Sequence, residues 1–213
     1  MEILNVEKYD RDEIINVSKG SQYITGEDYI EDVFDTWLKS GIFLKATEKN
    51  EILGFLHIRI FDTFIWLEGL RVSGKHKREG VGSALTQKAI DLSGKRKIRM
   101  IILDSNIPSI NLVKKFNFHE IDRIYYNIGE KMPFIDIIKK YDLKKLGENN
   151  KDPYLDDWAY FDNFYYKKYV YGNEELKILD TDPPFVINGS IEEEHVSKLK
   201  GDECFIVFER NFQ

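Results

Sequence analysis

The sequence HKREGVGSAL, residues 76–85, places two glycines around one valine, between a run of basic residues and an apolar repeat. In front of it, LEGLRV (67–72) has the composition of a strand. Behind it, apolar residues recur at helical spacing (Val81, Leu85, Ala89, Leu92). Gly94 follows where a helix C-terminal cap is expected. The stretch therefore predicts a strand, a basic loop and a helix whose first amide groups are unpaired.

Unpaired amides at a helix N-terminus attract phosphate, and glycine lets the phosphate approach the backbone closely. Lys75, Lys77 and Arg78 add positive charge to the loop. The helix dipole contributes about 0.3–1 kcal/mol, so the amide hydrogen bonds matter more. An alternative is that the two glycines serve only a tight turn and close packing.

Two common phosphate motifs are not met. A P-loop needs GxxxxGK followed by Ser or Thr, but five residues separate Gly74 from Gly80 and Val81 follows. A dinucleotide fingerprint needs a third glycine at position 85, which is leucine.

Composition limits the class of protein. The chain has 213 residues, 42% hydrophobic and 14% aromatic, which predicts one full core and at most a second small subdomain. A net charge of -6 argues against a nucleic-acid binder. The single cysteine, Cys204, excludes a disulfide framework and CxxC zinc pairs, which favours a cytoplasmic location; we expect Cys204 to be buried in the last strand. Neither a signal peptide nor an apolar run of about 20 residues is present, so we expect no membrane partner.

The first 130 residues alternate between strand-like and helix-like segments. Strands are expected over 2–9, 41–48, 51–61, 63–72, 99–105 and 118–126, with Lys49-Asn50 and Asp62-Thr63 as hairpin turns that make an antiparallel meander. Helices are expected over 12–19, from a Thr25–Asp28 capping box to Gly41, over 81–92, and from Pro108 to Phe116.

Residues 131–202 differ in composition and are rich in charge and aromatics. In residues 156–173 the aromatics Trp158, Phe161, Tyr165 and Tyr169 lie near helical spacing, which predicts a helix packed on the main core. A substrate lid or a dimer surface is the alternative, because aromatics are enriched at interfaces. ECFIVFERN (203–211) alternates like a strand that rejoins the main sheet.

Two blocks of this sequence resemble the signatures of the GNAT superfamily of acyl-CoA-dependent N-acetyltransferases. LRV (70–72) followed by KREGVG (77–82) is similar to the family's Leu-x-Val, short loop and Gln/Arg-x-x-Gly-x-Gly/Ala, with Lys77 in place of Gln or Arg. NIPSINLVKKFNF (106–118) is similar to its Asn-x-x-Ala/Ser-x-x-Leu-Tyr-x-Lys-x-Gly-Phe. The likeness covers roughly residues 1–128 and 203–211.

The resemblance implies an α+β fold, in which a mostly antiparallel sheet of six to seven strands parts between strands 4 and 5 and helices cover both faces. It implies a core at 1–130, an aromatic-rich insertion or subdomain at 131–202, and a final core strand at 203–213. It also implies acetyl-CoA as co-substrate, with pantetheine paired along the fourth strand and the pyrophosphate on the helix amides. The implied CoA-binding residues are Leu70, Arg71, Val72, Lys77, Arg78, Glu79, Gly80, Val81, Gly82, Ser83, Asn106, Ser109 and Lys115.

The catalytic groups are less determined by the motifs. In many relatives a tyrosine protonates the departing thiolate, but Val113 occupies that position here, so another tyrosine, a water or no acid at all would serve. Glu68 lies beside the expected thioester position and shares the facing of Leu70 and Val72, which makes it the candidate base or water-holding group. The alternative is a strand carboxylate paired with Arg71.

The histidines carry less information. His57 alternates with Phe55 and Arg59 and is interpreted as a packed side chain rather than a base. His119 and His195 lack a Cys or second His at ligand spacing, so no metal site is expected.

The acceptor is a matter for hypotheses. YITGEDYIEDVFDTWLKSGIFLKATEKNEILGF (23–55) followed by LEGLRV resembles the layout of the histidine N-acetyltransferase branch, which implies the α-amine of an amino acid or similar small molecule. The alternative acceptors are a protein N-terminus, a lysine, a polyamine and an aminoglycoside. A homodimeric assembly is also possible from the sequence. A catalytically silent acyl-CoA sensor or interaction module is the second class of hypothesis, and an enzyme acting on nucleotide phosphates is a third.

Overall fold

The computed structural model describes residues 1–21, 28–127, 131–149, 153–162, 167–191, 196–198 and 203–212. The chain forms two compact units. The first contains residues 1–100, 106–119 and 209–213, and the second contains residues 101–105 and 120–208. The chain passes from one unit to the other after residues 100, 105, 119 and 208.

Within the described residues, the first unit contains four helices and the strands of the predicted meander. In chain order the elements are β1 (Glu2–Asn5), α1 (Arg11–Lys19), α2 (Ile30–Trp37), β2 (Ile42–Glu48), β3 (Glu51–Ile60), β4 (Phe64–Val72), α3 (Val81–Leu92), β5 (Lys97–Leu103), α4 (Ile107–Lys115) and the start of β6 (His119–Asn127). Short 3-10 turns lie at Lys8–Asp10 and Gly74–His76.

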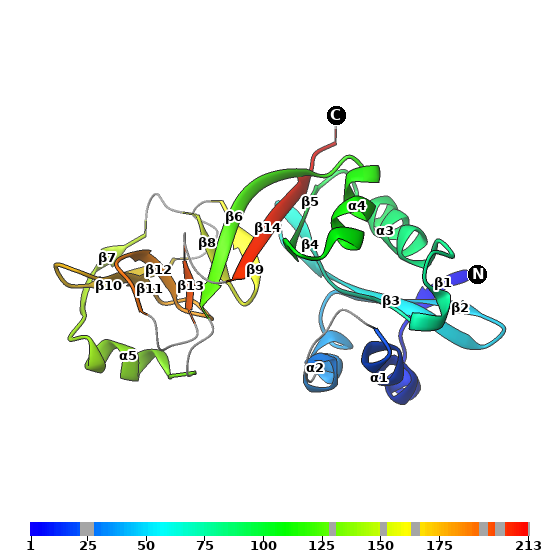
Figure 1. Ribbon diagram of the computed structural model, residues 1–213, viewed down its shortest axis with the longest axis horizontal. Coiled ribbons are helices and arrows are strands. Elements are labelled where there is room, and N and C mark those ends of the chain that lie inside the picture. Colours follow the sequence, from blue (N-terminus) through cyan, green and yellow to red (C-terminus); the bar gives the residue numbers. More distant parts are fainter. Residues whose placement is uncertain are drawn as a thin grey trace. The chain divides into compact units, whose positions relative to one another are not determined.

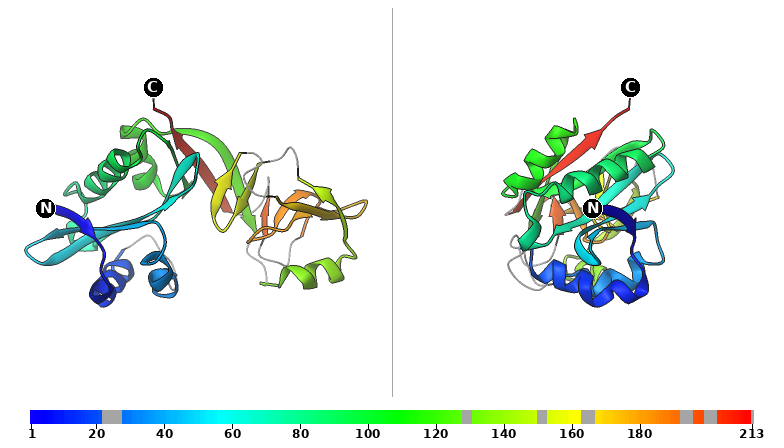
Figure 2. Two further views of the ribbon diagram at one scale, coloured as in Figure 1. Left: turned by 180° about the vertical axis from the view of Figure 1, so that it is seen from behind. Right: turned by 90° about the vertical axis from the view of Figure 1, so that its right-hand side faces the viewer.

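The meander is confirmed. β1, β2, β3 and β4 pair antiparallel in sequence order, and β4 pairs parallel with β5. The predicted turn residues Lys49 and Asn50 both have positive φ, which closes the β2–β3 hairpin tightly. Helices α1 and α2 lie on one face of the meander and α3 and α4 on the other (Figures 1 and 2).

The core under α1 and α2 is aromatic. Phe34 and Trp37 of α2 meet Phe43 of β2 at ring-centroid distances of 5.8 and 5.4 Å, both edge to face. The predicted helix therefore exists, but Thr25 lies outside the described residues and Asp28 does not complete a capping box. The Asp28 carboxylate instead accepts from Ser18 and from Arg71.

The second unit has its own core, in which α5 (Phe134–Lys140) packs through Ile137 against Ile178 and Val186. Its further strands are β7 (Lys144–Glu148), β8 (Tyr154–Asp156), β9 (Ala159–Phe161), β10 (Tyr169–Gly172), β11 (Lys177–Leu179), β12 (Phe185–Asn188), β13 (Val196–Lys198) and β14 (Glu203–Arg210). They pair in the order β14-β6-β13-β12-β11-β10-β7, and β8 and β9 form a separate hairpin.

The prediction of a helix over residues 156–173 is wrong. Asp157 and Trp158 both have positive φ and form the turn of the β8–β9 hairpin, and Tyr169 begins β10. Tyr165 lies outside the described residues. Three-residue strands separated by turns produced an aromatic spacing that resembled a helical repeat. The predicted last strand is confirmed as β14, where Cys204 is buried.

The chain is therefore a mixed α+β protein with predominantly antiparallel strand pairing, as predicted. Among the described residues, none of the helices has both the length and the apolar character required to cross a bilayer.

Candidate functional site

Strand β4 extends beyond its partner β5. The β4–β5 ladder runs from Phe64 to Trp66, yet β4 continues to Val72. The burial of β4 follows the same division: its first four residues are buried and its last five only partly buried. The last residues of β4 keep β3 as a partner, so their other edge offers backbone groups to an extended ligand.

A β-bulge interrupts β4 at Gly69. Two β4 residues, Gly69 and Leu70, stand opposite the single β3 residue Leu56. Gly69 has φ +67°, and a Cβ built on it would lie 2.2 Å from Trp37 Cη2, so both backbone conformation and space require glycine here.

The bulge changes which side chains share a face. Leu70 and Val72 approach α3, where their methyl groups lie near Gly82. Glu68 instead points to the α2 face, where it contacts His57. The prediction that Glu68 shares the facing of Leu70 and Val72 is therefore wrong, because the extra residue at the bulge shifts the alternation by one.

The N-terminus of α3 is open. Gly80 is the N-cap residue with φ +85°, and no side chain caps the helix. The first helical bond is donated by Ala84 N to Gly80 O at 2.9 Å, so the amides of Val81, Gly82 and Ser83 precede it and have no partner within the helix. A Cβ at Gly82 would meet Leu112 Cδ2 at 3.3 Å, whereas a Cβ at Gly80 would meet nothing within 4 Å.

Gly54 of β3 positions this helix, and sequence reasoning missed it. A Cβ on Gly54 would lie 2.6 Å from Arg71 O and 2.9 Å from Val81 Cγ1. The absence of a side chain at Gly54 therefore lets α3 begin directly against β3 and β4. A lone glycine inside a strand pattern was the available signal, because it marks close approach of another segment.

The loop between β4 and α3 is basic and mostly exposed. Lys75 and Arg78 are exposed, as is Glu79. His76 Nδ1 lies 2.8 Å from Glu79 Oε2, and its Nε2 lies 3.3 Å from Glu51 Oε1. The hydrogen bond with Glu79, followed by that with Glu51, raises the pKa of His76 above its ordinary value.

Helix α4 provides the predicted second block. Asn106 Oδ1 accepts from Ser109 N at 3.2 Å, so Asn106 caps the helix, and Pro108 lies in its first turn. Lys115 is exposed at the last turn. Val113 is 2% exposed, which confirms that this position supplies core packing and no proton donor.

Glu68 is an ion-paired strand carboxylate, as the alternative interpretation expected, but its partner is not Arg71. Glu68 Oε1 lies 2.7 Å from His57 Nδ1, and Glu68 Oε2 lies 3.7 Å from Arg59 Nη1. Arg71 instead pairs with Asp28 at 3.1 Å. Both side chains lie on the α2 side of β4, but Glu68 stands opposite His57 of β3 in the ladder, whereas Arg71 reaches the segment before α2.

Tyr29 lies beside this polar group. Its ring is stacked under the Arg71 guanidinium at 5.6 Å and meets Trp37 edge to face at 6.1 Å. Tyr29 is 46% exposed, and partial desolvation by the surrounding groups raises the pKa of Tyr29. Arg71 opposes this shift and Glu68 adds to it.

His57 is a packed side chain, as predicted, but it also contacts Glu68. His119 begins β6 and is exposed, and His195 lies outside the described residues. In the part of the chain that the structure describes, no three His, Cys, Asp or Glu side chains are grouped to hold a metal ion.

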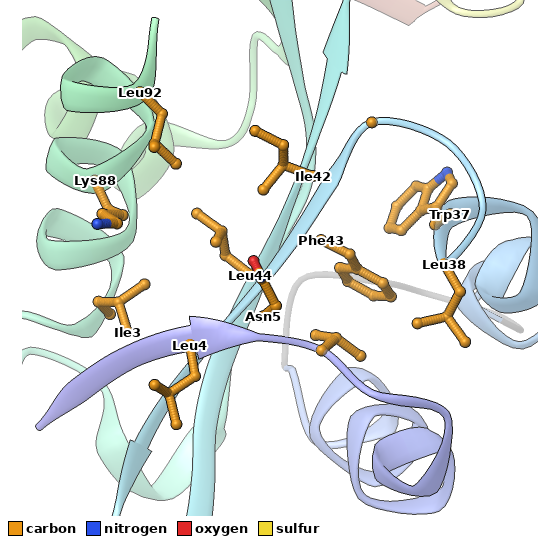
Figure 3. A pocket seen from close by; sticks show the side chains of 12 residues that line it. Ile3, Leu4, Asn5, Trp37, Leu38, Ile42, Phe43, Leu44, Lys88 and Leu92 are labelled. Carbon is orange, nitrogen blue, oxygen red and sulfur yellow. The ribbon is translucent and has the colours of Figure 1, made fainter.

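A cavity of about 590 Å³ lies next to this region, at the end of β1. Figure 3 shows Ile42 and Leu44 on the same side of β2 as Lys88 and Leu92 of α3, and Phe43 on the opposite side near Trp37. Most residues that line the cavity are aliphatic, and its lining includes neither the first residues of α3 nor Glu68. It therefore takes no part in the argument about acetyl transfer.

The acetyltransferase (GNAT) family model matches residues 11–118, and the chain belongs to this family. It is an acyltransferase of a family that uses acetyl-CoA as co-substrate. None of the curated proteins matches the sequence significantly.

Solved structures show the same fold. A candidate acetyltransferase from Thermoplasma acidophilum is similar over all of both chains, with 16% identity and a TM-score of 0.70. A candidate acetyltransferase from Pyrococcus horikoshii covers 100% of this chain and 89% of its own, with 15% identity and a TM-score of 0.62. The ribosomal-protein-S18-alanine N-acetyltransferase of Escherichia coli covers 62% of this chain and 84% of its own, with 20% identity and a TM-score of 0.52.

Proposed function

We propose that this enzyme transfers the acetyl group of acetyl-CoA to the primary amine of a small molecule, such as the α-amine of an amino acid, by direct attack in a ternary complex. The observation that carries the proposal is the uncapped N-terminus of α3 beside the unpaired edge of β4. These two features supply amide donors for a pyrophosphate and a strand edge for the amide-containing pantetheine arm.

The donor would be held mostly by the backbone. Leu70, Arg71 and Val72 would pair with pantetheine, and the amides from Arg78 to Ser83 would bind the pyrophosphate. Lys77 and Arg78 would add charge, and α4 would form the other wall with Asn106, Ser109 and Lys115. Because Asn106 Oδ1 already caps α4, its contribution toward the donor would come from its NH₂ group.

Glu68 is the proposed base, directly or through one water. An alkyl amine with a pKa of about 10.4 is protonated at pH 7, and freeing its lone pair costs about 5 kcal/mol. An α-amine with a pKa of about 8 costs only about 1.4 kcal/mol. Glu68, whose side chain is 15% exposed and whose Oε2 lies 3.7 Å from Arg59 Nη1, would be sufficient for the smaller task, which is why an α-amine suits this site.

The proposed reaction moves two protons and exchanges a C–S bond for a C–N bond. The ammonium gives one proton to Glu68, and the free amine attacks the thioester carbonyl. The C–N bond forms, the C–S bond breaks, and the thiolate takes up the second amine proton. The bulge at Gly69 leaves β4 backbone groups unpaired with β3 beside the proposed thioester position, where they can stabilise the oxyanion.

Calorimetry with CoA, together with thiol release from acetyl-CoA over an amine panel, tests the proposal. The panel contains free amino acids, alanine-ended and lysine-containing peptides, spermidine and an aminoglycoside. We expect CoA binding and turnover of one or more free amino acids. CoA binding without turnover of any amine would support the silent sensor instead, and turnover of peptides alone would assign a protein N-terminus or lysine as the acceptor.

A further inference from the structure

His57 is fully buried in an aromatic enclosure that leaves only its two ring nitrogens in polar contact. Trp37 stacks on the imidazole at 4.5 Å and 7°, and Phe43 meets its edge at 5.7 Å. Nε2 lies 2.6 Å from Ser40 O, and Nδ1 lies 2.7 Å from Glu68 Oε1. His57 is 0% exposed.

These two contacts fix the number of protons. A carbonyl oxygen only accepts, so Nε2 carries a hydrogen. The 2.7 Å contact between Nδ1 and Oε1 requires one further hydrogen between them, whether it resides on the ring or on the carboxyl group. The pair of His57 and Glu68 therefore has no net charge at rest, and Glu68 Oε2 is its remaining site for a proton.

We propose that His57 is a positioning residue that holds Glu68 as the proton acceptor of the reaction. This inference rests on the proposed function. The proton leaving the substrate ammonium binds Glu68 Oε2, while Oε1 accepts from His57 Nδ1–H and His57 Nε2–H donates to Ser40. After the product leaves, the proton on Oε2 passes to solvent. Without His57, the Glu68 carboxylate keeps the 3.7 Å contact of Oε2 with Arg59 but loses the partner of Oε1, so its approach to the amine is less well defined.

The backbone and the charged groups around His57 and Glu68 are consistent with a fixed orientation of the pair. A Cβ at Gly41 would lie 3.1 Å from His57 Nε2 and 2.1 Å from Ile58 O, so glycine is needed where the Ser40 carbonyl turns toward the ring. Among the described residues, the other charged or titratable groups around Glu68 are Arg59 on β3, Arg71 on β4, and Asp28 and Tyr29 before α2. Arg59 lies on the Oε2 side, where its charge favours the return of the proton to solvent.

Three substitutions of His57 separate positioning from packing. H57N keeps a donor near the Nδ1 position and can still hold Glu68. H57Q places its amide near the Nε2 position and holds Ser40 but not Glu68. H57F retains most of the ring contact with Trp37 and holds neither.

The assay is the pH dependence of kcat/KM for the acceptor found in the panel, for these three variants, E68Q and H57Q/E68Q. We expect a loss of about 10²-fold for E68Q, similar losses for H57Q and H57F, and about 10-fold for H57N. The double variant should be no slower than E68Q, and the acidic limb of the profile should move in H57Q. Additive losses in the double variant, or wild-type kcat/KM and pH profile in folded H57Q, would overturn the proposal.

A second measurement does not depend on turnover. The hydrogen between Nδ1 and Oε1 should give a slowly exchanging downfield proton resonance in the wild type that disappears in H57F and in E68A. Its absence in the wild type overturns the assignment of the pair. If the resonance is present but no amine is acetylated, the proposed function fails and a positioning role in this reaction fails with it, whereas the pairing itself stands.

Discussion

Gly69 makes the bulge of β4, and replacing it with alanine tests whether the bulge and Trp37 form one rigid unit. Two costs are expected in G69A. An alanine at φ +67° costs about 1–2 kcal/mol of backbone strain. Its Cβ would also lie 2.2 Å from Trp37 Cη2 and 2.6 Å from Trp37 Cζ3, so the indole must move. This displacement costs a further amount of about 1–3 kcal/mol. The total is about 2–5 kcal/mol.

Gly80 provides the matched control. Its φ of +85° is also positive, but a Cβ there would meet nothing within 4 Å, so G80A should cost only the strain of about 1–2 kcal/mol. Urea unfolding of both variants without CoA measures the difference, at unchanged m-value. If G69A is no less stable than G80A, the indole is not held against the bulge, and the rigid support inferred for His57 and Glu68 is wrong.

Three further predictions concern the donor and the acid. G82L should weaken CoA binding by at least about 10-fold in calorimetry, because leucine would collide with Leu112. K77A or R78A should weaken it only about 2–5-fold, the loss of one loop charge. Equal effects would contradict binding by backbone amides. The pKa of His76 is raised, so its positive charge and its contacts with Glu79 and Glu51 are fully present below the pKa of the unfolded chain and are lost as the pH rises through the folded pKa. CoA affinity should therefore fall over that pH interval, and it should fall more in the wild type than in H76Q. Y29F should lower kcat by less than about 10-fold in single-turnover kinetics, because the raised pKa of Tyr29 makes it a poor donor to a thiolate whose acid has a pKa of about 8.5; a loss above 100-fold would assign Tyr29 as the acid.

The features that local sequence determines were predicted well. The Lys49-Asn50 turn, the meander, α3 and α4 follow from patterns within about ten residues, as does the open N-terminus at Gly80. The bulge at Gly69 was not predictable in this way. It exists because Trp37, on a helix 32 positions earlier in the numbering, occupies the space of a missing side chain, and such a contact leaves no local pattern.

The missed functional contacts have the same origin. Glu68 was identified as a candidate, but its partner His57 was interpreted only as a packed residue, since pairing across β3 and β4 depends on a register that the bulge alters. The helix expected at 156–173 failed for a different reason. Strands of three residues are too short to show alternation, so the spacing of their aromatics was compatible with either structure.

Buried charge links the beginning of β5 to the end of the chain. Arg99, 2% exposed, donates to Glu209 at 2.8 Å across a separation of 110 residues, and both residues belong to the first unit. During synthesis Arg99 therefore emerges long before its carboxylate partner, and the first unit cannot be completed until the whole second unit has been made. The late arrival of Glu209 therefore delays completion of the acetyltransferase core, and shortening the chain before residue 209 would remove the Glu209 carboxylate from this buried pair.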